Sequence, residues 1–482
     1  MSQPPPAAAA AGAAMAEPRP HVLLVAAPFQ SHVNPLLRLG RRLAAKGLLV
    51  TFTTALRDGI RLAPGDVADA GAGHGRLRVE LLRGGGLWAP DDPRFRDAGD
   101  MARHVADEGP AALAALVRRE ADAGRPVACV VANAFVPWAL RAAGDLGLPR
   151  GMLWIQSCAL LSVYYHHVHA LAAFPEADAP TGSVTLPGLP ELDADDLRPL
   201  LIYASGHDLW RQMVVADLGS ARETISWLFV NTFDELEHAA VESLRKHLPV
   251  VVPVGPLLEP DDGESSVTAA DADGCVAWLD SHPARSVVFV AFGSLVKNES
   301  DEVAEIAAAL AGIGRPFLWV LRDDNSALLS AGALDAVAAA CGDGGGKVVP
   351  WCAQARVLAH GAVGCFVTHC GWNSTAEALA AGVPVVASPR WSDQRINARF
   401  LVDVHRVGVR AATPLTRDVL RGRVEEVMGG PDAEAMALRA ASWKAKARAA
   451  VSDGGSSARG IQAFVDHIRR LGEFETRADL LG

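Results

Sequence analysis

The sequence predicts an α/β protein built from two successive parallel-sheet domains, and three observations support this prediction. The chain has 482 residues, enough for two ordinary domains, and half of them are hydrophobic, so sizeable cores can form. In both halves, continuous apolar runs alternate with segments of helical spacing. Residues 257–274, rich in Asp, Glu, Ser and Gly, separate the two halves as a linker.

The first half opens with a βαβ unit. Residues 21–28 (HVLLVAAP) form a continuous apolar run, which is typical of a strand buried on both faces. Residues 34–47 have helical spacing and end in glycine, and residues 48–54 predict the next strand. The remaining elements of this half are expected at 126–133, 135–147, 150–157, 228–237 and 250–256.

The second half repeats the same alternation. Its elements are expected at 286–294, 300–312, 316–322, 347–351, 364–369, 373–381 and 383–389. The tail 454–474 predicts a glycine break followed by an amphipathic helix. We therefore expect an N-terminal domain at 20–256, the linker, a C-terminal domain at 275–453, and a C-terminal helix within 454–482 that packs back on the first domain.

Composition and the N-terminus exclude several classes of protein. The formal net charge is −10, the pI is near 5.8 and no dense basic block is present, which argues against general binding of nucleic acid or anionic membranes. No apolar run reaches the length of a membrane span. Residues 1–19 lack a basic start before their alanine run, which predicts a disordered low-complexity segment of a cytoplasmic protein, with Met1 or Met15 as its start.

The cysteines and acidic clusters do not predict a metal site. Seven cysteines are scattered along the chain and no pair has C-x-x-C spacing, so we expect buried, reduced thiols. Cys365, His369 and Cys370 do not have the spacing of a structural zinc site. The triplet Asp193-Ala-Asp195 is expected by chance in a chain with 55 acidic residues.

Two parallel-sheet domains in succession predict a ligand site in the cleft between them, beyond the carboxyl ends of the strands. The loop after the first strand, 28–35, lacks the G-x-G-x-x-G fingerprint, which argues against a dinucleotide oxidoreductase. His32 lies in this loop and is expected to face the cleft. It is either a hydrogen-bonded structural residue or a general base.

The stretch HCGWNSTAE, which starts at His369, follows one predicted strand and opens a predicted helix. The free N–H groups and the positive dipole end of such a helix bind phosphate without a cationic side chain. Gly371 permits close backbone approach, and the side chains of His369, Asn373 and Ser374 add donors. A simple capping box between Ser374 and Glu377 is the alternative, and the residues alone do not decide between the two.

These motifs resemble a known family. From Trp351 to Gln394 the chain reads WCAQARVLAHGAVGCFVTHCGWNSTAEALAAGVPVVASPRWSDQ, which closely resembles the signature of plant UDP-dependent small-molecule glycosyltransferases. The likeness extends over most of residues 20–470. It implies a GT-B fold, in which two Rossmann-like domains face each other across a cleft. It also implies UDP-glucose as a co-substrate held mainly by the C-terminal domain, a small aromatic acceptor, and neither cofactor nor metal.

The resemblance assigns roles to the residues of this signature. Trp351 would stack on uracil, the backbone of Cys352 would bind its edge, and Gln354 and Glu377 would hold the ribose hydroxyls. The diphosphate would be bound by His369, Gly371, Asn373, Ser374 and Ser294. The hexose hydroxyls would be bound by Trp372, Asp393 and Gln394. The terminal Gln394 favours glucose, whereas histidine at that position often goes with galactose.

The resemblance also makes His32 the base of an inverting transfer, but its usual partner is absent. Other members have an aspartate where this chain has Asn133, and an amide cannot carry the charge that stabilises an imidazolium. A phenol with a pKa of about 10 must lose its proton, whereas a carboxylic acid with a pKa of about 4 arrives ionised. We therefore hypothesise that the product is the glucose ester of a carboxylic acid.

The first half resembles most the branch that esterifies hydroxycinnamic, benzoic and indole-acetic acids. Ile155 stands where other branches have a sugar-contacting threonine, and Gln156 or Ser157 is a candidate replacement for it. The residues expected at the acceptor are Trp88, Trp138, Gln156 and Trp391. Two alternatives stay open, namely phenolic acceptors such as flavonoids and a UDP-sugar binding protein without activity.

Overall fold

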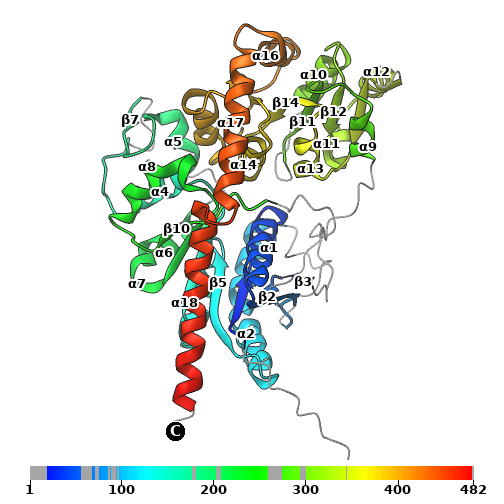
Figure 1. Cartoon of the computed structure of the whole chain (residues 1–482). Coiled ribbons are helices and arrows are strands. Elements are labelled where there is room, and N and C mark those ends of the chain that lie inside the picture. Colours follow the sequence, from blue (N-terminus) through cyan, green and yellow to red (C-terminus); the bar gives the residue numbers. More distant parts are fainter. Residues whose placement is uncertain are drawn as a thin grey trace, which may run out of the picture.

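The computed structural model describes residues 19–55, 68–70, 75–84, 87, 94, 97–175, 181–201, 208–258, 274–293, 300–342 and 345–479. These residues form two large sheets, each flanked by helices, one from each half of the chain (Figure 1). This is the predicted α/β architecture of two parallel-sheet domains. Residues 259–273, most of the expected linker, lie outside the described residues, and the predicted domain limits stay a prediction.

The first sheet has eight strands in the order β10-β9-β6-β5-β1-β2-β4-β3, all parallel except for the β3–β4 pair. The strands are β1 (His21–Val25), β2 (Leu49–Thr53), β3 (Ala68–Ala70), β4 (Gly75–Val79), β5 (Val127–Asn133), β6 (Arg150–Trp154), β9 (Trp227–Val230) and β10 (Val251–Pro253). In β1, β2 and β5 every residue is buried, because helices cover both faces of the sheet.

The helices of this half are α1 (Gln30–Ala45), α2 (Ala98–Asp122), α3 (Pro137–Asp145), α4 (Cys158–Val168), α5 (Ala194–Leu201), α6 (Asp208–Gly219), α7 (Ala221–Thr224) and α8 (Asp234–Arg245). Two predictions need correction. Helix α1 begins at Gln30, before the expected residue 34, so His32 lies in a helical turn rather than in a loop. The run 228–237 contains the end of β9 and the start of α8, because acidic residues favour a helix N-terminus.

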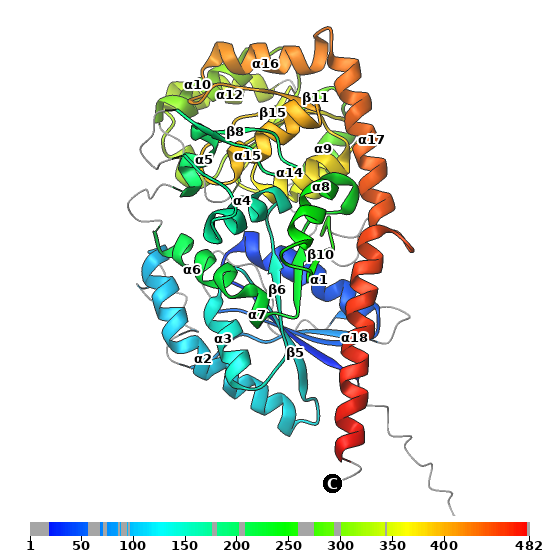
Figure 2. The same ribbon diagram turned by 90° about the vertical axis from the view of Figure 1, so that its left-hand side faces the viewer.

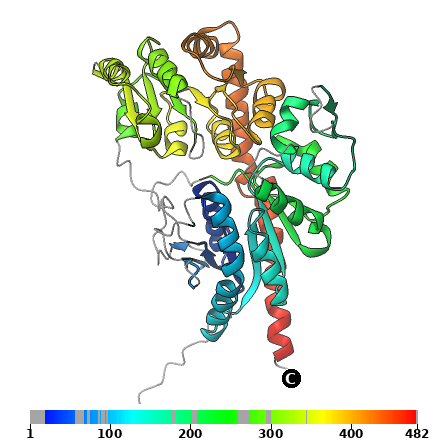
Figure 3. The ribbon, with the colours of Figure 1, turned by 180° about the vertical axis from the view of Figure 1, so that it is seen from behind.

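The second sheet has six strands in the order β13-β12-β11-β14-β15-β16, and all of its pairs are parallel. The strands are β11 (Val287–Ala291), β12 (Phe317–Val320), β13 (Gly346–Val349), β14 (Val363–Thr368), β15 (Val385–Ala387) and β16 (Gly408–Arg410). The helices are α9 (Cys275–Asp280), α10 (Ser300–Ala311), α11 (Asp323–Ser326), α12 (Ala331–Gly342), α13 (Gln354–Ala359), α14 (Trp372–Ala381), α15 (Gln394–Arg399), the π-helical segment Phe400–Val404, α16 (Arg417–Gly429) and α17 (Ala433–Val451). Figure 3 shows this half from behind, above the first.

The last helix, α18 (Ser456–Asp479), returns to the first sheet. Phe464 is fully buried there, and its ring lies edge-on to those of Trp227 at 5.4 Å and Phe229 at 4.9 Å. Arg469 donates to the carbonyl of Lys46 at 2.7 Å. Figure 2 shows α17 and α18 in succession along one side of the molecule. Helix α18 therefore packs on the first domain, and the burial of its apolar side chains stabilises this contact.

Two further sequence predictions can be compared with the structure. The six cysteines whose side chains are described are free and buried, as expected for reduced thiols. Among the described residues, no helix combines the length and the apolar character needed to cross a bilayer.

Candidate active site

The first turns of α1 and α14, one from each half of the chain, contact each other. Pro35 has no N–H, so the carbonyl of Ser31, four residues earlier, has no donor within α1. The side-chain amide of Asn373 donates to this carbonyl at 3.0 Å. Beside it, the indole N–H of Trp372 donates to the carbonyl of Asn231 at 2.7 Å. These bonds place the start of α14 against the strand ends of the first sheet.

The start of α14 is not a capping box. Its N-cap is Gly371, and no side chain caps the helix, so Ser374 lies within the first turn. The hydroxyl of Ser374 instead accepts from Gln354 at 2.9 Å. The amides of Asn373 and Ser374 belong to the turn in which helix N–H groups have no carbonyl partner in their own helix. No side chain therefore occupies the positive end of α14 as a cap, and anion binding there stays a prediction.

His369 lies directly before this turn, and two glycines make room for its ring. A Cβ atom on Gly371 would lie 2.5 Å from Nε2 of His369, and one on Gly293 would lie 2.7 Å from its Cε1. The Nδ1 atom is enclosed and has no hydrogen-bond partner among the residues that the structure describes. Burial, together with the positive charges of Arg390 and Arg322, lowers the pKa of His369 to about 4, so the ring is neutral at physiological pH.

A polar cluster on the far side of α14 joins the two halves of the chain. Gln354 donates to Glu377 at 2.8 Å, and Arg38 of α1 pairs with the other oxygen of this carboxylate at 3.3 Å. Arg38 also donates to the carbonyl of Leu257 at 3.0 Å. Both side chains of the ion pair are more than nine-tenths buried. The carboxylate expected to hold ribose is therefore bonded to residues from both halves of the chain.

Asp393 is the centre of a second polar cluster. Its carboxylate accepts from the side chains of Asn397, at 2.7 Å, and Gln156, and from the backbone N–H of Trp372. Burial raises the pKa of Asp393 to about 6 despite these hydrogen bonds. The Oε1 atom of Gln156 is buried without a partner. Gln156, from the loop after β6, therefore meets a residue of the expected sugar site.

Gln394, the next residue, is held in one orientation by the backbone. Its side-chain carbonyl accepts from the amides of Arg390 at 2.8 Å and Trp391 at 3.1 Å. Because the carbonyl oxygen is used in this way, the NH₂ group points away from these amides and is left to donate. Such a fixed donor beside the Asp393 carboxylate suits recognition of adjacent sugar hydroxyls.

His32 lies in the first turn of α1 and is neutral. Its ring contacts those of Phe135 at 5.0 Å, edge-on, and Phe29 at 5.6 Å. The Nδ1 atom is buried and has no hydrogen-bond partner in the described part of the chain. Burial lowers the pKa of His32 to about 3, and no neighbouring charge opposes that shift.

Asn133 ends β5, the strand that pairs with β1 next to the loop that leads to His32. The side chain is fully buried. Its Oδ1 atom accepts from the backbone N–H of Ala27 at 3.1 Å, and this bond determines the orientation of the amide. Among the described residues, the Nδ2 atom then has no hydrogen-bond partner. An unsatisfied buried donor of this kind is uncommon.

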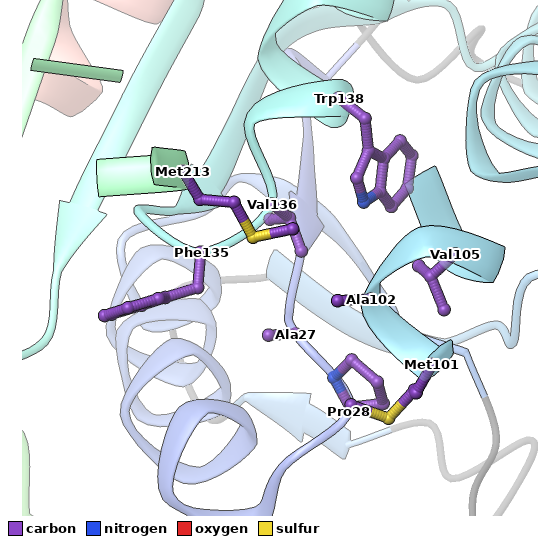
Figure 4. A pocket seen from close by; sticks show the side chains of 9 residues that line it. All are labelled: Ala27, Pro28, Met101, Ala102, Val105, Phe135, Val136, Trp138 and Met213. Atoms are coloured by element: carbon purple, nitrogen blue, oxygen red, sulfur yellow. The ribbon is translucent and has the colours of Figure 1, made fainter. Parts of the chain in front are cut away.

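A small apolar pocket lies near these residues (Figure 4). It is lined by Ala27, Pro28, Met101, Ala102, Val105, Phe135, Val136, Trp138 and Met213. Its walls come from the loops after β1 and β5 and from α2, α3 and α6. Phe135 lines the pocket and also contacts the ring of His32. An apolar ligand in this pocket would therefore reach the His32 and Asn133 region.

Comparison with known proteins decides the family. Residues 201–442 match the family model described as UDP-glucoronosyl and UDP-glucosyl transferase. The chain belongs to this family. It is therefore a UDP-glycosyltransferase, and its two parallel-sheet domains are the GT-B architecture that the sequence resemblance implied.

Relatives of this glycosyltransferase match it over nearly its whole length. Gallate 1-beta-glucosyltransferase 84A23 from Punica granatum is 41% identical over 468 residues, which cover 93% of this chain and 91% of the relative. Cinnamate beta-D-glucosyltransferase from Fragaria ananassa is 39% identical, with 94% and 83% covered. The crystal structure of Os79 from O. sativa in complex with UDP superposes with a TM-score of 0.76 at 30% identity, over 93% of this chain and all of that one.

The structure does not bring together all the residues that the sequence predicted for the glycosyltransferase site. Trp138 lines the pocket, whereas Trp391 is 38% exposed and is not among the lining residues. Trp88 and Ser294 lie outside the described residues. Trp351 is half-buried and Cys352 is buried, at the start of the loop that leads into α13. Asp193, which was not expected to bind metal, pairs with Arg399.

Sequence reasoning missed two positive charges that act on His369, those of Arg390 and Arg322. Arg390 pairs with Glu302, and its guanidinium lies 5.2 Å from the centre of the Phe292 ring. Its Nε and Nη2 atoms are buried without partners, and its charge acts on His369. The HCGWNSTAE stretch itself contains no lysine or arginine. Arg390 could have been found from the sequence, because it belongs to the same signature and follows this stretch by only a few residues.

Proposed function

We propose that this glycosyltransferase transfers glucose from UDP-glucose, with inversion, to the carboxylate of a small aromatic acid and so forms a glucose ester. The observation that carries the proposal is the neutral pair formed by His32 and Asn133. No carboxylate among the described residues faces His32, and burial holds the pKa of this histidine at about 3. The named activities of the relatives, on gallate and on cinnamate, support the same chemistry.

The donor would lie along the signature of the second domain. The diphosphate would meet the amides at the start of α14, the Asn373 side chain and His369. Glu377 would accept from the two ribose hydroxyls, because a carboxylate can accept two hydrogen bonds at once. Asp393 and Gln394 would bind the hexose, and Gln394 supports glucose over galactose. This donor is a co-substrate, and we expect no cofactor or metal.

The acceptor side is suited to a nucleophile that is already ionised. A weak base with a pKa of about 3 cannot take the proton of a phenol efficiently near neutral pH. An aromatic carboxylate has no proton to lose. Asn133 has an unused Nδ2 donor, and a neutral His32 has one ring N–H. Both would hold an anionic oxygen in place for attack on the anomeric carbon from the side opposite UDP.

An aspartate in place of Asn133 would act differently. It would accept the Ala27 N–H equally well, but its second oxygen would put a negative charge where Nδ2 now offers a donor. That charge would stabilise an imidazolium on His32 and repel an incoming carboxylate. The amide of Asn133 therefore favours carboxylate acceptors over phenolic acceptors. We further propose that the protein acts in the cytoplasm, which the free thiols of its described cysteines support.

An acceptor panel tests the proposal. Purified protein is incubated with UDP-glucose and, separately, with benzoate, cinnamate, indole-acetate and a flavonol, and products are identified by mass. We expect products from the acids, and we expect mild alkali to release glucose from them, because esters hydrolyse and phenolic glucosides largely do not. Products from the flavonol alone would make the protein a phenol glucosyltransferase. UDP binding without transfer to any acceptor would contradict the proposal.

A further inference from the structure

The pocket beside His32 has an unusual chemical composition. Of its nine lining residues, only Trp138 has a nitrogen or oxygen atom in its side chain. Figure 4 shows the Trp138 indole with its nitrogen on the edge of the ring that faces the pocket. The indole N–H donates and cannot accept. Among the described residues, the walls therefore offer a bound ring one side-chain donor, and their only side-chain acceptors are the weakly accepting sulfurs of Met101 and Met213.

The residues that line the pocket are tightly packed, so polar side chains cannot easily rotate into it. Trp138 is only 2% exposed, and its six-membered ring presses against α2 at Gly109. A Cβ atom at Gly109 would lie 2.7 Å from the Cζ3 atom of Trp138, so only glycine fits there. Met101 and Val105, on the same helix, are almost fully buried. Close-packed walls of this kind keep their composition when a ligand binds.

We propose that this pocket selects aromatic acids whose ring bears at most one polar substituent and rejects polyhydroxylated rings. This inference rests on the proposed ester-forming function and specifies its acceptor class. It separates this chain from the relatives named for gallate, whose acceptor has three ring hydroxyls. The single substituent that fits best is a hydrogen-bond acceptor such as a methoxy oxygen, which the Trp138 N–H can meet.

The physical reason is the loss of hydrogen bonds to water. A ring hydroxyl that leaves water for this pocket finds no side-chain oxygen or nitrogen acceptor among the described lining residues, so no such group replaces its hydrogen bond to water. An apolar pocket discriminates about a hundredfold against an isostere that adds one unmatched hydroxyl. We therefore expect kcat/KM for gallate to be at least about a hundredfold below that for benzoate.

A matched series of four benzoates tests this selection. It comprises benzoate, para-methoxybenzoate, gallate, and the benzoate with methyl groups at the three positions where gallate has hydroxyls. Methyl and hydroxyl groups are similar in size, so this acid separates polarity from bulk. We expect benzoate, the methoxy acid and the trimethyl acid all to outpace gallate clearly.

Gallate turned over as fast as benzoate would overturn the inference, as would equal rejection of gallate and the trimethyl acid, which would make size the cause. If none of the four acids is glucosylated while a phenol is, the proposed function itself fails, and that outcome differs from failure of ring selection.

A substitution in the wall tests the same idea from the protein side. Val105→Thr replaces a methyl group with a hydroxyl of similar size, which gives gallate an acceptor inside the pocket. We expect the ratio of kcat/KM for gallate to that for benzoate to rise about tenfold. Val105→Ala is the matched control, because it adds space without polarity. Equal gains in both variants, or no gain in Val105→Thr, would contradict the proposed role of polarity.

Discussion

The substitution Asn133→Asp replaces the side-chain NH₂ group of Asn133 with an oxygen atom. We expect it to reverse the preference for carboxylate over phenolic acceptors. The new side chain would keep the hydrogen bond from Ala27, because either carboxylate oxygen can accept it. The second oxygen would replace the unpartnered Nδ2 donor. The variant site would then contain a negative charge next to His32. In the parent protein this histidine is neutral and has no ionised partner among the described residues.

The two consequences can be estimated separately. At a separation of about 7 Å and an effective dielectric constant of about 20, the new charge repels an acceptor carboxylate by about 2.4 kcal/mol, or about fiftyfold in kcat/KM. An adjacent carboxylate raises the pKa of a histidine by about 1–3 units, from about 3 for His32 in this structure. We expect the stronger base to raise phenol turnover at least about tenfold. The preference for acids over phenols should fall about five-hundredfold.

The assay is kcat/KM for benzoate and for a phenol, measured with UDP-glucose on the same preparation of the variant. Because the two rates are compared as a ratio, a loss of folded protein cancels. Asn133→Ala is the matched control, since it removes the amide without adding charge and should not help phenols. A ratio unchanged within about threefold of the parent value would refute the reasoning about Asn133.

Three further predictions concern the donor side and pH. As pH falls through about 6, Asp393 takes up a proton and loses acceptor capacity, so the KM for UDP-glucose should rise. The kcat with benzoate at saturating UDP-glucose should not change over this range, because His32 remains neutral. A kcat that follows the titration of a group near pH 6.5 would contradict this prediction. Arg38→Met leaves the buried Glu377 unpaired, and calorimetry should show UDP bound at least about tenfold more weakly. Gln156→Leu should raise the KM for UDP-glucose about tenfold while leaving the affinity for UDP unchanged, because Gln156 meets the sugar end of the site; a parallel loss for UDP would refute that placement.

Local pattern was enough to predict most of the fold. The buried strands of both sheets lie within continuous apolar runs, and the start of α14 follows one of them. Helix α2 was not predicted, because Gly109 and Pro110 in its centre argue against a helix by propensity. The structure shows why tertiary packing overrides propensity there: Gly109 is the surface on which the Trp138 ring lies.

The interdomain contacts were beyond the reach of sequence reasoning, since they join residues far apart in the chain. Nothing in the local pattern brings Gln156 to Asp393 or Arg38 to Glu377. Such contacts depend on how the two sheets are oriented, which helical and strand periodicity do not encode. The early start of α1 also depends on such a contact, because the Ser31 carbonyl, which Pro35 leaves without a donor in the helix, accepts from Asn373.

The most direct test of ester formation uses an acceptor that offers both nucleophiles in one molecule. With UDP-glucose and para-hydroxybenzoate, carboxylate and phenol compete at equal concentration for the same anomeric carbon. The neutral site formed by His32 and Asn133 predicts a product that mild alkali cleaves and that retains a titratable phenol. A product that resists alkali and retains its carboxylate would contradict the account.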